Sequence, residues 1–374
     1  MSTEHTHSRI IEERAKAGLR SLYVGDSLAM PVHWYYNPID ILKAFPGGIQ
    51  KLEDATEYHP SSIMSLHSTA KGGRGKQATG VGREIVGEVI LKGKRSFWGL
   101  PNQHYHKGMK AGENTLNAHC ARLLTRAMIA GGGRYDKERF LNDYINFMTA
   151  DSPRHPDTYA ESYHRGFFAN LESGTPPERC GSVTHDTPSV GGLVMLAPIA
   201  ITLFLHGKPL QSVQDVCREH LVLTHPDTFL ARIGDAFVKL ISDLLFRKDD
   251  TEARQPIAEA AQRSMGINVN SLAAKARTDN DVVGRRYSTA CYITDSWPSI
   301  LYLAYKYAND PKAGLLANTN LGGDNVHRGA ILGVILGLAT NRTVDAFFNA
   351  LKDRQAIDEE IMALIDPPEG SGKR

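Results

Sequence analysis

The sequence predicts an all-α protein built around one continuous hydrophobic core. Apolar residues recur at intervals of three and four positions in segment after segment, as they do on the buried face of a helix. The alternation of apolar and polar residues that marks a half-buried strand is almost absent. The chain has 374 residues, of which 41% are hydrophobic, so it can bury a large core. We therefore expect a single domain over residues 1–374.

The first element is a helix over 8–29, which enters the core and ends before Pro31. Residues 37–107 then lose helical periodicity and contain many Gly, Pro and His residues. We expect a long insertion over 57–107, a candidate lid, because such loops in compact proteins are usually functional or disordered. Its segment KGGRGK at 71–76 could hold a phosphate through backbone amides and positive charge, although it lacks the P-loop pattern.

Helical patterns resume after this insertion. The segment 190–205 is apolar on nearly all sides, which predicts a helix at the centre of the core. HPDT at 155–158, HDTP at 185–188 and HPDT at 225–228 place an acid and a hydroxyl before a helix, as N-caps do. Residues 367–374 are expected to form a flexible tail. The other expected helices are 108–132, 136–150, 158–173, 212–224, 227–247, 251–265, 296–308 and the helix that begins near Asp324.

Composition excludes several functional classes. The 43 basic and 41 acidic residues give a net charge of +2 without a polybasic tract, so nucleic-acid binding is not expected. No apolar run is long enough to span a bilayer, and the N-terminus is too charged for a signal peptide, so we expect a soluble cytoplasmic protein. The four cysteines lie far apart in sequence, and neither disulfides nor zinc-thiolate sites are expected.

Two helix starts carry polar residues ahead of apolar helices rich in small residues. One contains Glu113 and Asn114, and the other contains Asp324, Asn325 and His327. An acid such as Asp324 could simply act as an N-cap. If the two helix starts face each other, they form a pocket with inward amide dipoles, which suits a phosphate or a hard cation.

Two further groups could belong to the same pocket. Asp26 lies within an otherwise apolar helix, where a buried carboxylate needs a partner. His33 and Trp34 follow it and could form a pocket wall, or could only cover the end of the helix. His104 and His106 lie two positions apart, as a metal pair or an acid and base pair would, or as two histidines of a surface loop.

Taken together, these segments resemble the ADP-ribosylglycohydrolase family, which includes the dinitrogenase-reductase-activating glycohydrolases, the ADP-ribosyl-acceptor hydrolases and the J1-crystallins. The resemblance extends over nearly the whole chain. It implies a compact orthogonal bundle of helices, a cleft for ADP-ribose and, in active members, two magnesium or manganese ions. The segments that carry it are GDSLAMP at 25–31, GGLVMLAPIAITL at 191–203, YITDSWPSILYLAYKY at 292–307 and LGGDNVHRGAILGVILGLA at 321–339.

The sequence departs from the family's metal motifs. The family's Thr-Asp-Asp-Thr motif corresponds to residues 112–115, where Glu113 and Asn114 replace the two acids. In the Gly-Gly-Asp-Thr-Asp motif, Asp324 matches the first acid, but Val326 stands at the second. His33 stands where some members carry another acid. A site that needs several carboxylates for two dications can hardly form unchanged.

Two accounts remain open. In the first, the cleft has been rebuilt to cleave an ADP-ribosyl or related ribosyl bond of a small molecule or an ADP-ribosylated substrate, with a single metal or none. In the second, the protein binds ADP-ribose or a nucleotide without catalysis, or is structural as crystallins are. We favour the first, because the cluster remains polar. Catalytic roles are expected for Asp26, Glu113, Asp324 and His327, metal contacts for Glu113 and Asp324, and substrate contacts for His33, Trp34, His104, His106, Asn114 and Asn325.

Overall fold

The structure is a computed structural model that describes residues 2–67, 69, 82–248 and 253–365. It is all-α, as predicted: the described residues form helices and isolated β-bridges, but no strand. Segments 71–76 and 367–374, expected as a phosphate loop and a tail, lie outside the described residues. The α-helices are α1 (Ser2–Ala29), α2 (Pro38–Ala44), α3 (Leu116–Ala130), α4 (Lys137–Met148), α5 (Ser162–Glu172), α6 (Leu196–Leu205), α7 (Leu210–Val222), α8 (Thr228–Leu245), α9 (Arg254–Met265), α10 (Val269–Lys275), α11 (Ile293–Lys306), α12 (Pro311–Leu321), α13 (Asn325–Thr340), α14 (Asp345–Phe348) and α15 (Arg354–Ile365).

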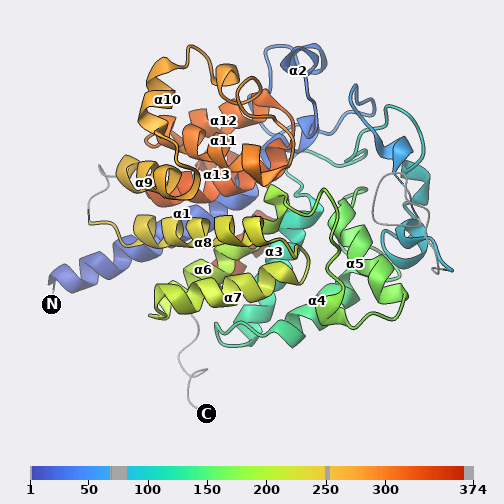
Figure 1. The fold of residues 1–374 in the computed structure, drawn as a ribbon, viewed down its shortest axis with the longest axis horizontal. Coiled ribbons are helices and arrows are strands. Elements are labelled where there is room, and N and C mark those ends of the chain that lie inside the picture. The colour runs from blue at the N-terminus through green and yellow to red at the C-terminus, as the bar shows by residue number, and fades with distance from the viewer. Residues whose placement is uncertain (1, 68, 70–81, 249–252, 366–374) are drawn as a thin grey trace.

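Helices α1 and α13 pack closely and form the centre of the bundle. Figure 1 shows them behind α8, between a group formed by α9 to α12 and a group formed by α3 to α7. A methyl group on Gly333 would lie 2.1 Å from the carbonyl oxygen of Ser21, and one on Gly337 would lie 2.4 Å from that of Ala17. The small residues of α13 therefore let the two backbones touch, which fixes where α13 begins relative to the end of α1.

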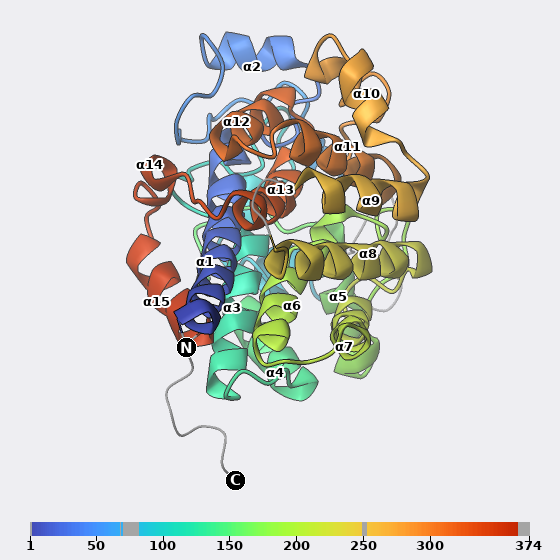
Figure 2. The same cartoon turned by 90° about the vertical axis from the view of Figure 1, so that its left-hand side faces the viewer.

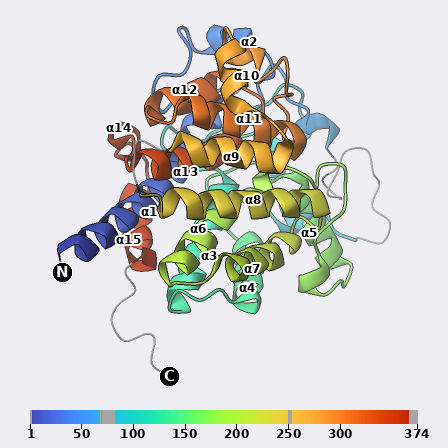
Figure 3. The same cartoon turned by 60° about the vertical axis from the view of Figure 1, so that its left-hand side comes forward.

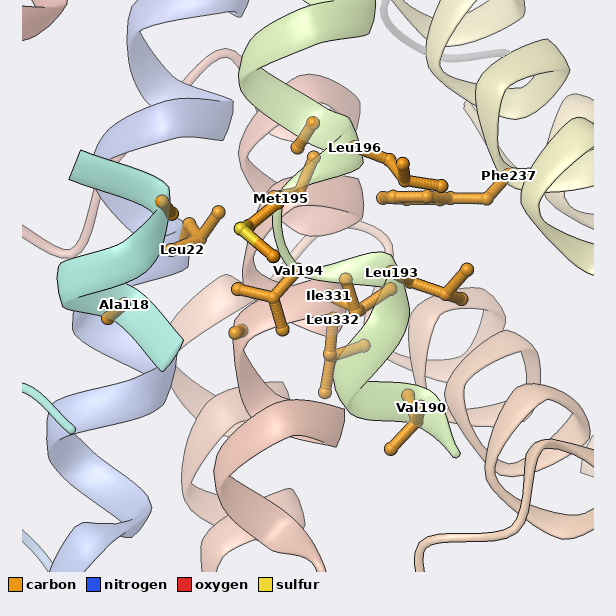
Figure 4. Close-up of a cluster of buried hydrophobic side chains, with 14 of the residues drawn as sticks. Leu22, Ala118, Val190, Leu193, Val194, Met195, Leu196, Phe237, Ile331 and Leu332 are labelled. Carbon is orange, nitrogen blue, oxygen red and sulfur yellow. The ribbon is translucent and has the colours of Figure 1, made fainter. Parts of the chain in front are cut away.

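The core is continuous around this pair, and Figure 2 shows α3 and α15 beside α1. The segment predicted as one central helix over 190–205 is divided into a 3₁₀ turn, η6 (Val190–Leu193), and α6. Side chains of η6 and α6 interlock with those of α1, α3, α8 and α13 in Figure 4. Figure 3 shows α8 crossing the face of the bundle above α6 and α7.

The expected helix over 108–132 is too long at its N-terminus, because α3 begins only at Leu116. Residues 108–115 form turns, and Gly112 has φ of +86°. Carboxylates from elsewhere bind the first amides of the helix: Asp26 accepts from Thr115 N at 2.9 Å, and Asp157 accepts from Leu116 N at 2.8 Å. These carboxylates satisfy N–H groups that have no intrahelical partner.

Other parts of the fold were not anticipated, including α2, which lies in the stretch predicted to be irregular, and α12 and α15. Across the described ranges, no helix has both the length and the apolar character that crossing a membrane requires. All four cysteines are free and buried.

Candidate active site

A cluster of buried polar side chains lies where α13 begins. Asp324 and His327 belong to the start of α13, and His33 follows η1 (Met30–Val32), the short turn after α1. Each is at most 3% exposed. Their candidate ligand atoms lie within 4.8 Å of one another. The close packing of α1 and α13 thus brings together residues from opposite ends of the sequence.

Two glycines hold this cluster in place. Gly322 and Gly323 have φ of +68° and +66°, a conformation that L side chains rarely adopt. A methyl group on Gly322 would lie 2.0 Å from the carbonyl oxygen of Tyr35. Gly323 N donates to that oxygen at 2.7 Å, and Gly323 O accepts from Trp34 N at 2.7 Å. The segment that carries His33 is therefore fastened against the start of α13.

A continuous line of hydrogen bonds crosses the cluster. Asp157 Oδ1 lies 2.7 Å from His106 Nδ1, and His106 Nε2 lies 2.7 Å from His33 Nδ1. His33 Nε2 lies 3.1 Å from Asp324 Oδ1. The same oxygen lies 2.7 Å from His327 Nδ1. Five side chains from four parts of the chain thus form one buried network.

A second branch of the network leaves from the other nitrogen of His327. Asn117 Nδ2 lies 2.7 Å from His327 Nε2 and 3.3 Å from Glu161 Oε2. Asn117 Oδ1 accepts from Tyr163 at 2.5 Å and lies 2.9 Å from His164 Nε2. Glu161 Oε1 also lies 3.5 Å from His327 Nδ1. Two carboxyl groups, those of Glu161 and Asp324, therefore face the same imidazole.

Burial and charge set the protonation of Asp324 and His33, which lie in the line of hydrogen bonds from Asp157 to His327. Burial alone would raise the pKa of Asp324, but the charge of His327 and hydrogen bonds from His327 and His33 lower it overall. Burial lowers the pKa of His33 well below its usual value, and the hydrogen bond to Asp324 offsets this only in part. Asp324 is therefore ionised, and His33 is neutral at physiological pH.

The second branch combines opposing influences on His327. Burial alone would lower its pKa, but the carboxylates of Asp324 and Glu161 raise it to about 10. Burial raises the pKa of Glu161 to about 7, against the opposing charge of His327. The Asn117 amide nitrogen beside His327 Nε2 requires a ring nitrogen without a proton. His327 is thus fully protonated only when that amide turns to present its oxygen.

Two pockets reach this network. The outer pocket lies between the segment after α1, the start of α5 and the loop before α11. The inner pocket is small and is lined by His33, His106, Asn117 and His327, among others. Tyr159 and Glu161 line both pockets. The wall of the outer pocket is formed by Trp34, Tyr36, Ile63, His67, Tyr159, Glu161, Ser162, Tyr163, Arg165, Asp186, Ser189, Ala290, Cys291 and Tyr292.

The structure brings together several residues singled out from the sequence. Asp324, His327, His33 and His106 share the network, and Trp34 lines the outer pocket. The alternative reading of Asp324 as a side-chain N-cap does not hold, because it makes no side-chain capping bond to α13. The alternative of surface histidines does not hold either, because His106 is 1% exposed.

Other expected site residues have different partners. Glu113 accepts from the amide of Lys110 within an exposed turn, at 2.8 Å. Asn114 donates to Asp26 at 2.8 Å, and Asp26 also accepts from the amide and the hydroxyl of Thr115. Burial raises the pKa of Asp26. The structure therefore uses Asp26 and Asn114 to join α1 to the start of α3, and Glu113 lies outside the cluster of ligand atoms formed by His33, Asp324 and His327.

His104 and Asn325 hold the backbone around the cluster. His104 Nε2 lies 3.1 Å from the carbonyl oxygen of Pro31, and its Nδ1 accepts from the amide of His106. Asn325 Nδ2 donates to the carbonyl oxygens of Val32 and Thr319. Neither residue is among those lining the outer or the inner pocket.

Sequence reasoning missed Asp157, Asn117 and Glu161. Asp157 lies in the first HPDT motif, but it binds the first amide of α3 rather than the helix after it. The second HPDT motif behaves as predicted, because Asp227 caps α8 by accepting from Leu230 N. Glu161 precedes α5 and makes no side-chain capping bond. A carboxylate next to apolar and aromatic residues was the available signal for both acids.

Comparisons with known proteins agree with this architecture. The family model described as ADP-ribosylglycohydrolase matches residues 7–366. A solved structure titled "ADP-ribosylglycohydrolase-related protein complex" is similar to the chain with a TM-score of 0.58 and 14% sequence identity, covering 96% of this chain and 98% of that chain. At this identity the similarity establishes the fold alone. No curated protein matches the chain.

Proposed function

Because the chain belongs to the ADP-ribosylglycohydrolase family, we propose that it hydrolyses the glycosidic bond of an ADP-ribosyl group or of a related ribosyl N- or O-glycoside. The observation that carries this proposal is the pair of carboxyl groups around His327. Asp324 Oδ1 lies 2.7 Å from His327 Nδ1, and Glu161 Oε1 lies 3.5 Å from the same nitrogen. Glycoside hydrolysis commonly uses two carboxyl groups in different protonation states. The substrate is a small molecule or an ADP-ribosylated group that enters the outer pocket.

The two carboxyl groups have distinct places in this reaction. Glu161 lines both pockets and donates its proton to the leaving-group atom as the bond to the anomeric carbon breaks. Water attacks that carbon and gives a proton to the ionised carboxylate of Asp324. His327 contacts both groups and orients them. The products are the free sugar and the protonated leaving group.

The residues do not fit the pair of magnesium or manganese ions that the family resemblance implies. Hard dications of this kind need several oxygen ligands. Asn114 turns its amide nitrogen toward Asp26, whose oxygens accept three hydrogen bonds. Val326 offers no donor atom, and Glu113 binds a backbone amide. No step of the proposed reaction therefore passes through such a pair.

The long insertion contributes to recognition in this proposal. Ile63 and His67 line the outer pocket, and His106 belongs to the buried network. We propose that the described residues of the insertion, 57–67, 69 and 82–107, shape the entrance and select the leaving group, as the lid expected from the sequence would. Aromatic side chains of the wall, including Trp34 and Tyr159, offer faces for a planar group.

The test is release of free ADP-ribose or ribose from a panel of arginine-linked, serine-linked and nucleobase-linked substrates, followed by mass spectrometry. We expect the wild-type protein to cleave at least one class, and Asp324→Asn to lower turnover at least a hundredfold. Asp215→Asn removes an exposed carboxylate on α7 and should leave turnover unchanged. Tight binding of ADP-ribose without cleavage of any class would contradict catalysis and support the binding-protein alternative.

A further inference from the structure

We infer that His33, Asp324 and His327 bind one divalent transition-metal ion of the zinc or iron(II) class, in place of a magnesium or manganese pair. Two imidazoles and one carboxylate form this set, and the three side chains are buried. Imidazole nitrogen favours such ions, whereas magnesium prefers an octahedral shell of oxygen atoms. The inference concerns metal binding and does not depend on the proposed reaction.

The line of hydrogen bonds that ends at His33 suits a metal ligand. Asp157 Oδ1 lies 2.7 Å from His106 Nδ1 and can accept a proton from it. His106 Nε2 can in turn accept from His33 Nδ1, 2.7 Å away. This order of donors makes His33 Nε2, 3.1 Å from Asp324 Oδ1, available to a metal ion that binds both atoms.

An unpartnered oxygen points to the same conclusion. Asp324 Oδ2 is buried and has no hydrogen-bond partner within the described part of the chain. Asp324 is 1% exposed, so bulk water cannot replace that partner. A buried carboxylate oxygen without a partner is costly. A metal ion bound by Asp324 would satisfy the carboxylate where the protein itself does not.

The outer residues of the network match those that support metal-binding histidines. Such histidines usually donate their second N–H to a carboxylate, carbonyl or water, which fixes the tautomer. His33 Nδ1 lies against His106 Nε2, and His106 Nδ1 lies against Asp157 Oδ1, so the ligand nitrogen of His33 is positioned through two further side chains. Ligands about 2.1 Å from a tetrahedral ion lie roughly 3.4 Å apart. The candidate ligand atoms of the three side chains lie at most 4.8 Å from one another, so only small side-chain movements would bring them to that spacing.

His327 must change its proton arrangement to join the site. A metal ion on Nδ1 displaces the proton there, which leaves to solvent when Nε2 is already protonated, and the N–H at Nε2 needs an acceptor. The Asn117 amide, 2.7 Å away, provides one when it turns by 180°, which barely moves its heavy atoms. Its oxygen would then face Glu161 Oε2 at 3.3 Å, a contact that the protonated carboxyl group satisfies. The turned amide nitrogen would face the hydroxyl of Tyr163 and His164 Nε2, both of which can accept a hydrogen bond.

The experiment is elemental analysis of the purified protein, followed by calorimetric titration of the metal-stripped protein with zinc and with magnesium. We expect one zinc or iron ion per chain and zinc affinity at least a hundredfold above magnesium affinity. His33→Asn and His327→Asn should each lower zinc affinity at least a hundredfold. His206→Asn, at the end of α6, removes a histidine outside the network and should leave affinity unchanged.

A third variant keeps the test decisive if ligand variants fail to fold. His106→Gln retains all three ligands but removes the control of the His33 tautomer, so zinc affinity should fall by about 10–100-fold. Thermal melting verifies that each variant is folded. Zinc affinity that is the same in wild type and these variants, two ions per chain, or equal affinity for magnesium and zinc would overturn the inference. Wild-type protein that binds no transition metal would overturn it as well.

Discussion

Asp157 binds His106 through one carboxylate oxygen, 2.7 Å from Nδ1, and the two side chains are buried. The other oxygen of Asp157 accepts from Leu116 N, the first amide of α3, at 2.8 Å. One carboxylate therefore stabilises a helix start and fixes the tautomer of an imidazole in the polar network. The fold and the site share this residue, so a change there affects both.

Replacing Asp157 by Asn should destabilise the fold. Asn has one oxygen and one NH2 group, so it can accept a hydrogen bond from Leu116 N or from His106 Nδ1, but not from both. One buried donor therefore loses its partner. We expect a loss of about 2 kcal/mol in unfolding free energy, measured by urea denaturation. Asp227→Asn is the matched control, because Asn caps a helix as well as Asp does. Equal losses in both variants would argue against the dual role of Asp157.

The close approach of α1 and α13 predicts the effect of a single methyl group. In Gly333→Ala, the added carbon would lie 2.1 Å from Ser21 O, so the two helices must separate. We expect a loss of about 1–3 kcal/mol by denaturant unfolding. Gly82→Ala meets no atom within 4 Å and should change stability by less than about 0.5 kcal/mol. Comparable stability of the two variants would mean that this packing is less rigid than described.

His220 makes the protein sensitive to acid. Burial lowers its pKa to about 3, so the folded state resists a proton that the unfolded chain accepts near pH 6.5. Stability is thus fully present above pH 6.5 and is lost as the pH falls toward 3. Between pH 8 and pH 5 the wild type should lose about 2 kcal/mol more than His220→Gln, measured by urea denaturation at each pH. Parallel pH curves would contradict this assignment.

Tyr36 tests the outer pocket as the substrate site. Its ring lines that pocket and is 43% exposed, so its removal should not disturb the core. Tyr36→Ala should raise KM roughly tenfold, which corresponds to about 1.4 kcal/mol, with little change in kcat. This is the result expected when the ring binds the substrate and the transition state equally well. Tyr58, which is 63% exposed and lines a different pocket, provides the control variant Tyr58→Ala. An identical KM for Tyr36→Ala and wild type would place the substrate elsewhere.

Helical periodicity and small-residue patterns were enough to predict the fold class, because they report directly on which faces are buried. The stripe of glycines on α13 predicted a buried helix, and its close contact with α1 explains the pattern. The short helices α2 and α14 have too few turns for a periodic signal. The start of α3 was misplaced because its amides are bound by Asp26 and Asp157, which lie far away in sequence.

The site was only partly predictable for the same reason. Asp324 and His327 lie three positions apart on one helix, so their contact follows from helical spacing. The partnership of His106 with Asp157 depends on two loops whose approach no local pattern encodes. Glu113 stood at a motif position, yet its side chain closes a turn with Lys110. A motif position indicates where a backbone runs, whereas the contacts of the side chain depend on the tertiary fold.

The most direct measurement of the proposed reaction compares wild type and Glu161→Gln on two ribosides that differ only in the leaving group. A serine-type alkoxide must be protonated to leave, whereas p-nitrophenolate leaves without a proton. We predict that Glu161→Gln lowers kcat on the serine-type riboside by about 10²–10⁴-fold and on the p-nitrophenyl riboside by less than about tenfold. Equal losses on both substrates, or no loss on either, would contradict glycosidic-bond cleavage with Glu161 as the acid.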